Sequence, residues 1–272
     1  MAFVCGGSKG IGRETVKEFV RLGGSVLIVA RSPETLQAAA REAEALRKDP
    51  NQFVDTLACD TRDMESLKPA FEGVIARTRA PDYLFNLVGY AFPQYIQKLT
   101  LSDFKENMDV NYYGQLVPIL ILLPHWMALR RGHIANVASG AAFIGAVGYS
   151  TYAPTKFAIA GLSQCLRNEL KPYNIKVSVL YPPDTDTPGF EAENRTKPDV
   201  LAIMSQRFDQ MQPEDVARAF LRGVLREDFY ILPGDSRRLW LATRFFPGLA
   251  NRIADREYRR ALEQVKSAPT GN

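Results

Sequence analysis

The sequence predicts an α/β fold, namely a doubly wound parallel sheet of the Rossmann type in a single domain with a helical C-terminal tail. Short apolar runs typical of buried strands alternate with longer amphipathic segments along most of the chain. A glycine-rich turn at residues 6–12 separates the first apolar run from the first helical segment. Arginines and aromatic residues interleave near the C-terminus. We therefore predict a domain over residues 1–235 and an amphipathic helical tail over 236–272.

Length and composition limit the classes of protein that fit. The chain has 272 residues, of which 46% are hydrophobic and 24% charged, as in a globular protein with one sizeable core. The net charge of +4 is mild, and no zinc spacing or RNA-binding signature is present, so no nucleic-acid partner is expected. Cys5, Cys59 and Cys165 lie in or beside apolar runs. This pattern predicts buried thiols in a reducing compartment rather than a disulfide framework.

Neither a metal site nor a membrane span is expected. The two histidines, His125 and His133, read as structural residues, so no metal site is predicted. The longest apolar stretch, 116–127, contains two prolines and His125, and it predicts a buried helix rather than a bilayer span. Only five residues precede the glycine turn, which leaves the first strand short and keeps open a native leader or membrane segment upstream.

The elements follow in order from periodicity and from turn and cap residues. The predicted strands are 2–5, 25–30, 53–59, 83–87, 133–138, 176–180 and 229–232. The predicted helices are 10–22, 33–48, 64–77, a long one from Ser102 with Asp103 as a capping aid, one that begins near Tyr152, 213–225 and 256–266. Glu191–Arg207 is predicted to be a mobile substrate lid, and the last residues, 267–272, a frayed end.

The glycine-rich turn predicts a site for a dinucleotide pyrophosphate. Glycine lets the backbone approach a phosphate closely, and the start of a helix offers unpaired N–H groups. The spacing is G-x-x-x-G-x-G, which differs from the common G-x-G-x-x-G fingerprint. Its place after a strand and before a helix supports the assignment. The candidate contacts are Gly6, Ser8, Lys9, Gly10, Ile11 and Gly12.

Arg31 indicates which nucleotide binds. It stands at the end of the second predicted strand, where an acidic residue would bind the ribose 2′-hydroxyl of NAD and an arginine accommodates the 2′-phosphate of NADP. Arg31 and Lys9 together favour NADPH/NADP⁺, although each could instead be a solvated surface cation. Asp60, after the third strand, is a candidate partner for the adenine amino group. Its alternative role is to cap the next helix with Thr61 and Asp63.

Two later loops complete the predicted nucleotide site. Asn86 ends the fourth strand, and Gly89 would let the chain pass close to the cofactor. The loop from 181 to 190 is rich in proline and leaves the carboxyl end of a strand, where ligands bind in open parallel sheets. Its candidate contacts are Pro182, Thr185 and Thr187, of which Thr187 could bond the nicotinamide carboxamide.

Ser139, Tyr152 and Lys156 form a compact proton-donating site. Tyr152 and Lys156 are four residues apart and share one helix face, and Ser139 ends the strand before them. This set fits the reduction of a ketone, with Ser139 donating to the carbonyl oxygen and Tyr152 delivering the proton. Because free tyrosine has a pKa of about 10, we expect the Lys156 cation to lower the pKa of Tyr152. Asn111 is expected to hold a water that links Lys156 to solvent.

Together, the glycine turn, Asn86 to Gly89, Asn111 and the Ser139, Tyr152 and Lys156 set resemble the short-chain dehydrogenase/reductase family. The resemblance runs from residue 2 to about 232, and it departs from the family at Cys5 and at Leu87-Val88, where the family usually has threonine and alanines. It implies a Rossmann-type NADP-binding domain, catalysis by Ser139, Tyr152, Lys156 and Asn111, and binding of the ribose by Tyr152 and Lys156. It also implies a homodimer or homotetramer through the helices that hold Asn111 and Tyr152.

The loop YPPDTDTPGFEAENRTKP, residues 181–198, with Ala30-Arg31 and residues 171–174, is similar to 3-ketodihydrosphingosine reductases. This similarity implies NADPH-dependent reduction of 3-ketosphinganine, a long-chain amino-ketone lipid, to sphinganine in sphingolipid synthesis. It implies a place on the cytosolic face of the endoplasmic reticulum membrane in a eukaryote, and otherwise in the cytoplasm. The basic and aromatic tail could rest on an anionic membrane surface or pack on the body or a second subunit.

Two other functions stay open from the sequence. One is an NADP-dependent carbonyl reductase of another lipid ketone, such as a steroid or a 3-ketoacyl group. The other is a non-catalytic NADP-binding regulatory protein, against which the complete Ser139, Tyr152 and Lys156 set argues.

Overall fold

The computed structural model describes residues 1–206 and 209–267, and its centre is one parallel sheet. Its seven strands lie in the order β3-β2-β1-β4-β5-β6-β7, and every pairing is parallel. Their bounds are β1 Ala2–Cys5, β2 Val26–Ala30, β3 Val54–Ala58, β4 Tyr83–Asn86, β5 Gly132–Val137, β6 Ile175–Leu180 and β7 Tyr230–Ile231. The predicted fold class and all seven predicted strands are confirmed, with ends that shift by a residue or two.

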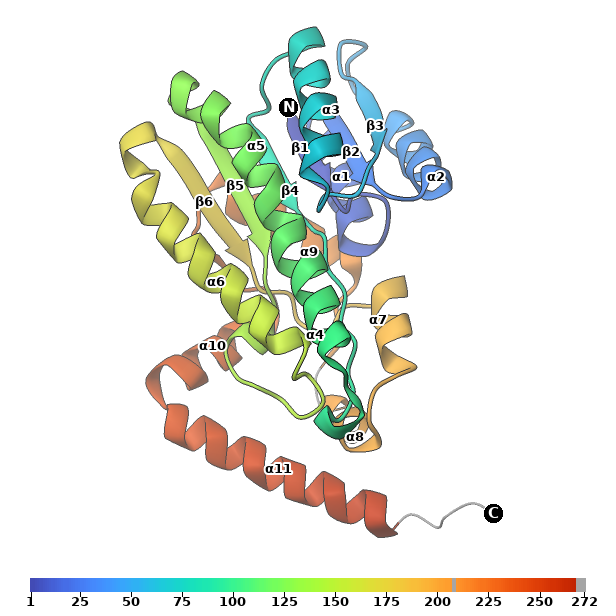
Figure 1. Ribbon diagram of the computed structural model, residues 1–272, viewed down its shortest axis with the longest axis vertical. Helices are drawn as coiled ribbons and strands as arrows, with labels where there is room; N and C mark the ends of the chain where they lie inside the picture. The colour runs from blue at the N-terminus through green and yellow to red at the C-terminus, as the bar shows by residue number, and fades with distance from the viewer. Residues whose placement is uncertain (207–208, 268–272) are drawn as a thin grey trace.

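Helices cover both faces of the sheet (Figure 1). One face carries α1 Gly10–Arg21, α2 Pro33–Glu44 and α9 Pro213–Leu225. The other carries α3 Met64–Arg77, α4 Leu101–Met108, the π-helical turn η2 Asp109–Tyr113, α5 Gly114–Leu129 and α6 Tyr152–Glu169. The remaining elements are α7 Pro188–Asn194, α8 Asp199–Ser205, α10 Ser236–Phe245, α11 Pro247–Ser267 and four short 3₁₀ or π turns, η1 Ile96–Lys98, η2, η3 Gly140–Ala142 and η4 Lys171–Tyr173.

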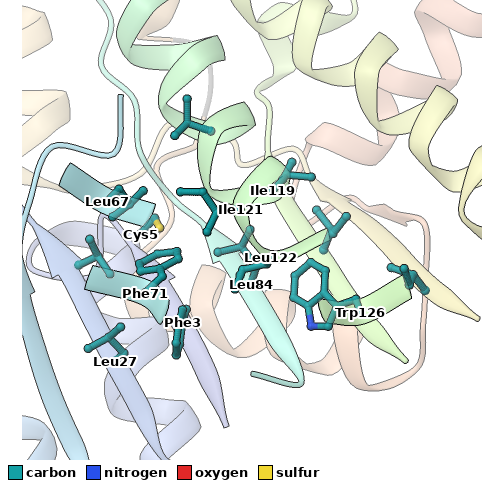
Figure 2. Close-up of a cluster of buried hydrophobic side chains, with 14 of the residues drawn as sticks. Phe3, Cys5, Leu27, Leu67, Phe71, Leu84, Ile119, Ile121, Leu122 and Trp126 are labelled. Atoms are coloured by element: carbon teal, nitrogen blue, oxygen red, sulfur yellow. The ribbon is translucent and has the colours of Figure 1, made fainter. Parts of the chain in front are cut away.

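Alternation along each strand creates the two cores. In β1, Phe3 and Cys5 belong to one hydrophobic cluster and Ala2 and Val4 to the other, because successive side chains point to opposite faces of a sheet. Figure 2 shows the first cluster, in which side chains of α3 and α5 meet those of the strands. Within it, the Phe3 and Phe71 rings pack edge to face with centroids 4.8 Å apart. Strands buried on both faces explain the continuous apolar runs in the sequence.

The helical segment Leu101–Leu129, formed by α4, η2 and α5, includes the apolar stretch 116–127 that was predicted to be a buried helix. It is long and apolar enough, by length and composition alone, to cross a membrane. The sequence had indicated no such segment, because Pro118, Pro124 and His125 interrupt the apolar run, yet the helix continues through both prolines. Within the fold it covers the sheet, where its residues Ile119, Leu122 and Trp126 join the core. We therefore interpret it as the core helix of this face.

Both histidines make side-chain contacts within the fold, and two of the cysteines, Cys5 and Cys165, differ in burial. His133 is buried, its Nε2 lies 2.8 Å from the Ser178 hydroxyl, and burial lowers its pKa to about 4. His125 Nε2 lies 3.0 Å from Glu72. Both contacts are structural. Cys5 is buried as expected, but Cys165 is exposed because the inward face of α6 is formed by Ile159, Ser163 and other residues at helical spacing.

The predicted lid and tail are both helical. Residues 188–194 and 199–205 form α7 and α8, and Val200 and Leu201 of α8 are buried, which differs from a wholly open loop. α11 packs against α8, and α10 packs against η3. The tail therefore lies at the end of the molecule beyond the carboxyl ends of the strands (Figure 1). Of the predicted frayed end at 267–272, Ser267 is the last residue of α11, and residues 268–272, like Arg207, lie outside the described residues.

Candidate active site

The glycine turn forms a backbone-lined cradle at the start of α1. Gly6 has φ +79°, and a Cβ there would lie 2.8 Å from the Leu87 backbone. At Gly12 a Cβ would lie 2.1 Å from the Gly6 carbonyl oxygen, so neither position admits another residue without a shift. Lys9 is the N-cap of α1, and its side chain makes no capping bond. The first N–H groups of the helix are therefore free to bind an anion.

Of the remaining residues of the turn, some pack against the protein interior and others face solvent. Ser8 is buried, Ile11 packs against the core beneath the turn, and Lys9 is exposed. A Cβ on Gly10 would lie 3.1 Å from the Thr187 side chain, so the turn and the start of α7 touch. The Thr187 hydroxyl accepts a hydrogen bond of 3.1 Å from the Phe190 N–H and caps α7. Its predicted bond to the nicotinamide carboxamide stays a prediction.

The cations at the end of β2 are placed as expected. Arg31 is exposed and makes no ion pair among the described residues, while its charge contributes to lowering the pKa of Asp60. The larger cause of that lowering is Arg62, whose guanidinium lies 2.8 Å from Asp60. Asp63, not Asp60, caps α3. The capping alternative for Asp60 is therefore wrong, and Arg62 is a third cation at this edge that sequence reasoning missed.

The Asn86 side chain is turned into the protein, and a cofactor contact by this residue stays a prediction. Its side chain is fully buried and donates to the Gln115 carbonyl at 3.0 Å and to Asn136 Oδ1 at 2.9 Å. Gln115 in turn donates to the carbonyls of Val88 and Val137, both at 3.1 Å. These residues tie the ends of β4 and β5 to α5. A polar residue within the apolar run of α5 was the signal that could have revealed Gln115.

Asn111 sits in the π-helical turn η2 and clamps two segments. Its Oδ1 accepts from the Tyr90 N–H at 2.9 Å, and its Nδ2 donates to the Tyr90 carbonyl at 2.9 Å and to the Thr155 hydroxyl at 3.0 Å. A Cβ on Gly89 would lie 3.1 Å from Lys156 Nζ and 3.2 Å from Asn111 Oδ1. Asn111 is therefore close to Lys156, and the water that would link them to solvent stays a prediction. The π-helical turn, a feature frequent at functional sites, was not anticipated.

The catalytic candidates Ser139, Tyr152 and Lys156 come together as predicted. Lys156 Nζ lies 5.5 Å from the centre of the Tyr152 ring and donates to the Val137 carbonyl at 3.1 Å. Ser139 lies close enough to Tyr152 to lower the pKa of the phenol, and its hydroxyl accepts a hydrogen bond from the Ala141 N–H at 3.2 Å. The serine comes from the end of β5, and the other two come from the first turns of α6.

The electrostatics of Tyr152 correct the expected effect of Lys156. Burial raises the pKa of Tyr152 above its ordinary value, the charges of Glu193 and Asp184 raise it further, and only Ser139 lowers it. Burial also lowers the pKa of Lys156 to about 8, so the lysine charge is itself disfavoured. The phenol is therefore protonated at neutral pH. This is the form that a proton donor needs.

The lid adds charged groups near the proton donor. Tyr149, whose ring centre lies 5.5 Å from that of Tyr152, donates its hydroxyl to Glu193. Lys197 Nζ lies 3.2 Å from the same carboxylate. Asp184, in the loop after β6, raises the pKa of both tyrosines. In the sequence, Asp184 belongs to the proline-rich loop and Glu193 to the predicted lid, where both could attract a cation or simply be solvated carboxylates.

Pro182 and Thr185 of that loop lie as follows. Pro182 is half-buried, and Thr185 is buried with its hydroxyl donating to the Pro183 carbonyl at 2.8 Å. Thr185 also pairs in a parallel bridge with Met211. Thr185 therefore holds the loop in place, and a cofactor contact by either residue stays a prediction.

Comparisons with known proteins agree with this geometry. The family model for short chain dehydrogenase matches residues 1–198. A 3-dehydrosphinganine reductase from Danio rerio is 35% identical over 227 residues, which cover 83% of this chain and 68% of the relative. A 3-ketodihydrosphingosine reductase from Dictyostelium discoideum is 34% identical over 242 residues, which cover 84% and 72%. The chain belongs to the short-chain dehydrogenase family, in the branch of the 3-ketodihydrosphingosine reductases.

Solved structures give the same fold and bear on the cofactor. A 3-oxoacyl-[acyl-carrier protein] reductase from Brucella melitensis has a TM-score of 0.71 at 25% identity, over 82% of this chain and 83% of that one. A structure of such a reductase with bound NAD has a TM-score of 0.68, with 82% of each chain covered. As a short-chain dehydrogenase, this chain uses a nicotinamide cofactor. The uncapped start of α1 and the glycine cradle fit its pyrophosphate.

The cradle gives a first prediction. We expect Gly12→Ala to weaken binding of the nicotinamide nucleotide by about tenfold or more, because the added methyl group meets the Gly6 carbonyl. The measurement is the dissociation constant from quenching of protein fluorescence by the nucleotide. Gly73→Ala is the matched control, because a Cβ there has no neighbour within 4 Å. Equal affinities in the two variants would show that the turn does not hold the nucleotide.

Proposed function

We propose that this protein reduces 3-ketosphinganine to sphinganine with NADPH, as a step of sphingolipid synthesis. The observation that carries the proposal is the convergence of Ser139, Tyr152 and Lys156 beside the glycine cradle in a chain whose relatives are named for this reaction. A 3-ketoacyl substrate finds support in the solved structures, at lower identity.

Each residue of the proposed site has a separate role in the reduction. NADPH, when bound, supplies the hydride that reaches the carbonyl carbon. Ser139 donates to the carbonyl oxygen and fixes its position, and Tyr152 gives that oxygen its proton. Lys156, held by the Val137 carbonyl, places a positive charge beside the phenol and binds the ribose hydroxyls together with Tyr152. Asn111 holds Thr155 and the Tyr90 backbone in register with Lys156 and supports the return of a proton from solvent.

The activity itself is the second prediction. We expect NADPH oxidation when 3-ketosphinganine is supplied in mixed micelles, and we expect Tyr152→Phe to lower turnover at least about a hundredfold, because it removes the donated proton. The measurement is the fall in NADPH absorbance, with nucleotide affinity as the control for folding. Wild-type turnover in a folded Tyr152→Phe variant would sink the assignment. A wild-type protein that binds NADPH but reduces no ketone would favour the regulatory alternative.

We further propose that Arg31, with Lys9, selects NADPH over NADH. Arg31 is exposed at the end of β2 and has no ion-pair partner among the described residues, so its guanidinium is available to the 2′-phosphate. Asp60 is turned to Arg62, which removes its charge from competition with that phosphate. Its bond to the adenine amino group remains part of the proposal.

The third prediction follows from this arrangement. We expect Arg31→Ala to raise KM for NADPH roughly tenfold and to leave KM for NADH nearly unchanged, because only NADPH carries the lost phosphate contact. Steady-state kinetics with each nucleotide measure both constants. Arg41→Ala, on the following helix α2, is the control. Equal effects on the two nucleotides would contradict phosphate recognition by Arg31.

We propose that the tail, residues 236–272, rests on an anionic membrane surface. From Ser236 to the end of the chain there are eight Lys or Arg and three Asp or Glu, a net charge of +5 (8 − 3), against +4 for the whole chain. Phe245 and Phe246 are 63% and 64% exposed, and Leu249 and Ile253 beside them are more than half exposed. Basic and aromatic residues in one amphipathic segment are typical of interfacial helices.

The place of the tail supports this role. A shallow hollow on α11 is lined by Glu263 and by Arg252, Arg256, Arg259 and Arg260. α10 packs on η3, which directly follows Ser139, and Leu239 comes within 3.2 Å of a Cβ built on Gly140. The tail would therefore hold the catalytic end of the molecule against the membrane that contains a long-chain lipid. In a eukaryotic cell this would be the cytosolic face of the endoplasmic reticulum, and otherwise the cytoplasmic side of a membrane.

The fourth prediction concerns this surface. We expect the double variant Phe245→Ser, Phe246→Ser to bind vesicles containing phosphatidylserine at least about tenfold more weakly than wild type, because two apolar side chains no longer enter the interface. Co-sedimentation with vesicles measures the partition coefficient at low and high salt. Leu22→Ser, equally exposed outside the tail, is the matched control. Unchanged partitioning of the double variant would leave the tail as a packing element only.

We also propose a homodimer, or a tetramer built from it, through α5 and α6. Both helices lie on the same face of the sheet (Figure 1), and they expose Leu120 and Phe157, each 46% accessible. We expect Phe157→Glu to shift the sedimentation coefficient towards that of a monomer, because a charge would be buried in the interface. A wild-type monomer at micromolar concentration would contradict the proposal.

A further inference from the structure

The segment between β6 and α8 places two carboxylates, Asp184 and Glu193, near the proton donor. Tyr149 bridges them, because its hydroxyl donates to Glu193 while its ring lies beside that of Tyr152. Asp184 acts on the same two tyrosines through its charge. Both acids belong to the segment between β6 and α8, which lies beyond the carboxyl end of the sheet (Figure 1). A ketone that accepts a proton from Tyr152 must therefore bind near both carboxylates.

Glu193 differs from the solvated acids around it. Its side chain is 14% exposed, whereas that of Glu191 is 71% exposed and pairs with Arg195 at 2.7 Å. Both partners of Glu193, the Tyr149 hydroxyl and Lys197 Nζ, approach its Oε1 atom. Among the described residues, no hydrogen bond reaches Oε2. This oxygen of a mostly buried carboxylate can therefore accept a hydrogen bond from a ligand.

Lys197 is a buried amine that lies beside Glu193. Its side chain is 2% exposed, and its Nζ has no hydrogen-bond partner among the described residues, although it lies 3.2 Å from Glu193 and 4.5 Å from the centre of the Phe190 ring. A buried amine without hydrogen bonds is unfavourable. A primary alkylammonium group therefore already lies beside Glu193, ion-paired with the carboxylate but without a hydrogen bond.

The negative charges around Glu193 outnumber the positive charges. Asp184 and Glu193 each carry a negative charge, and Lys197 supplies one positive charge. The Asp184 carboxylate forms no hydrogen bond or ion pair among the described residues, and its pKa is raised first by burial and then by Glu193, against the effect of Lys197. Two partly buried carboxylates that share one cation favour the entry of a second cation.

We infer that Asp184, Glu193 and Lys197 form a subsite for the ammonium group of the substrate, with the Lys197 amine as its placeholder. The inference rests on the proposed function, because the substrate of that reaction carries an amino group on the carbon next to the ketone. This connectivity brings the ammonium beside the oxygen that Tyr152 protonates. The ammonium then pairs with Glu193 Oε2 and with Asp184, and Lys197 Nζ gives way to it.

The same pairing changes the proton donor. The charges of Glu193 and Asp184 contribute to holding the pKa of Tyr152 above its ordinary value, after burial, while Ser139 opposes them. An ammonium between the two carboxylates offsets that part of the effect. The substrate group that is recognised also makes proton delivery by Tyr152 easier, so ketones without it are reduced more slowly as well as bound more weakly.

The test compares two ketones across matched variants. One is 3-ketosphinganine, and the other is the same chain with hydrogen in place of the amino group, both in mixed micelles with NADPH. The quantity measured is the ratio of kcat/KM for the amino ketone to that for its neutral analogue. We expect Glu193→Gln and Asp184→Asn each to lower this ratio at least about tenfold. Glu191→Gln, which is exposed on the same helix, should keep the wild-type ratio.

Further measurements separate recognition from a merely structural effect. We expect Glu193→Asp to restore part of the ratio, and Lys197→Met to lower KM for the amino ketone, because the competing amine is gone. Nucleotide affinity and melting temperature confirm that each variant folds. If both ketones are reduced and the ratio is the same in wild type, Glu193→Gln and Asp184→Asn, the subsite is wrong and the proposed function stands. If neither ketone is reduced, the proposed function fails, and the subsite fails with it.

Discussion

The backbone of Val137, at the carboxyl end of β5, is the point on which the catalytic arrangement depends. Its carbonyl accepts from both Gln115 and Lys156 at 3.1 Å, and its N–H donates to Gln115 at 3.2 Å. Asn136 beside it bonds to Asn86 of β4 and to Ser163 of α6. One strand end therefore fixes its neighbour and two helices by buried polar bonds. Such bonds specify a unique arrangement only when nearly all of them are satisfied.

The nucleotide end of the site is formed mainly by backbone groups, whereas the end that holds Tyr152 is formed by buried side chains. At the glycine turn the ligand surface is backbone, because Gly6 and Gly12 leave no room for side chains. At the catalytic end the groups are buried side chains whose charges oppose one another. Burial disfavours the charged form of Lys156. Burial and the carboxylates of Glu193 and Asp184 disfavour the anion of Tyr152. The chemistry thus depends on what enters the site to rebalance these charges.

The fold and the proximity of Ser139, Tyr152 and Lys156 could be predicted from the sequence because both rest on local patterns. Buried parallel strands appear as apolar runs, and Tyr152 and Lys156 share a helix face by spacing alone. What the sequence could not show depends on contacts between distant segments. Asn86 turned inward because Gln115, 29 residues away, accepts its hydrogen bond. The pKa of Tyr152 was misjudged because burial and Glu193, in the lid, outweigh the lysine expected to act on it.

Individual side chains were less predictable than whole elements. Cys165 lies in an apolar run, yet its angular position on α6 turns it to solvent. The π-helical turn that aims Asn111 has no known mark in the sequence. The sequence alone does not show which of Glu191 and Glu193, two positions apart, is buried. Only the packing of Tyr149 and Lys197 around one of them separates a partly buried group from a solvated one.

Placing the catalytic lysine has a thermodynamic consequence for the whole chain. Lys156 has a pKa of about 8 in the folded protein, below the 10.5 of an exposed lysine. The unfolded chain therefore binds more protons between these values, so the contribution of Lys156 to the free energy of unfolding rises with pH across that window. At neutral pH the charged lysine costs the fold on the order of 3 kcal/mol. The position that suits catalysis is one at which the folded state is weakened.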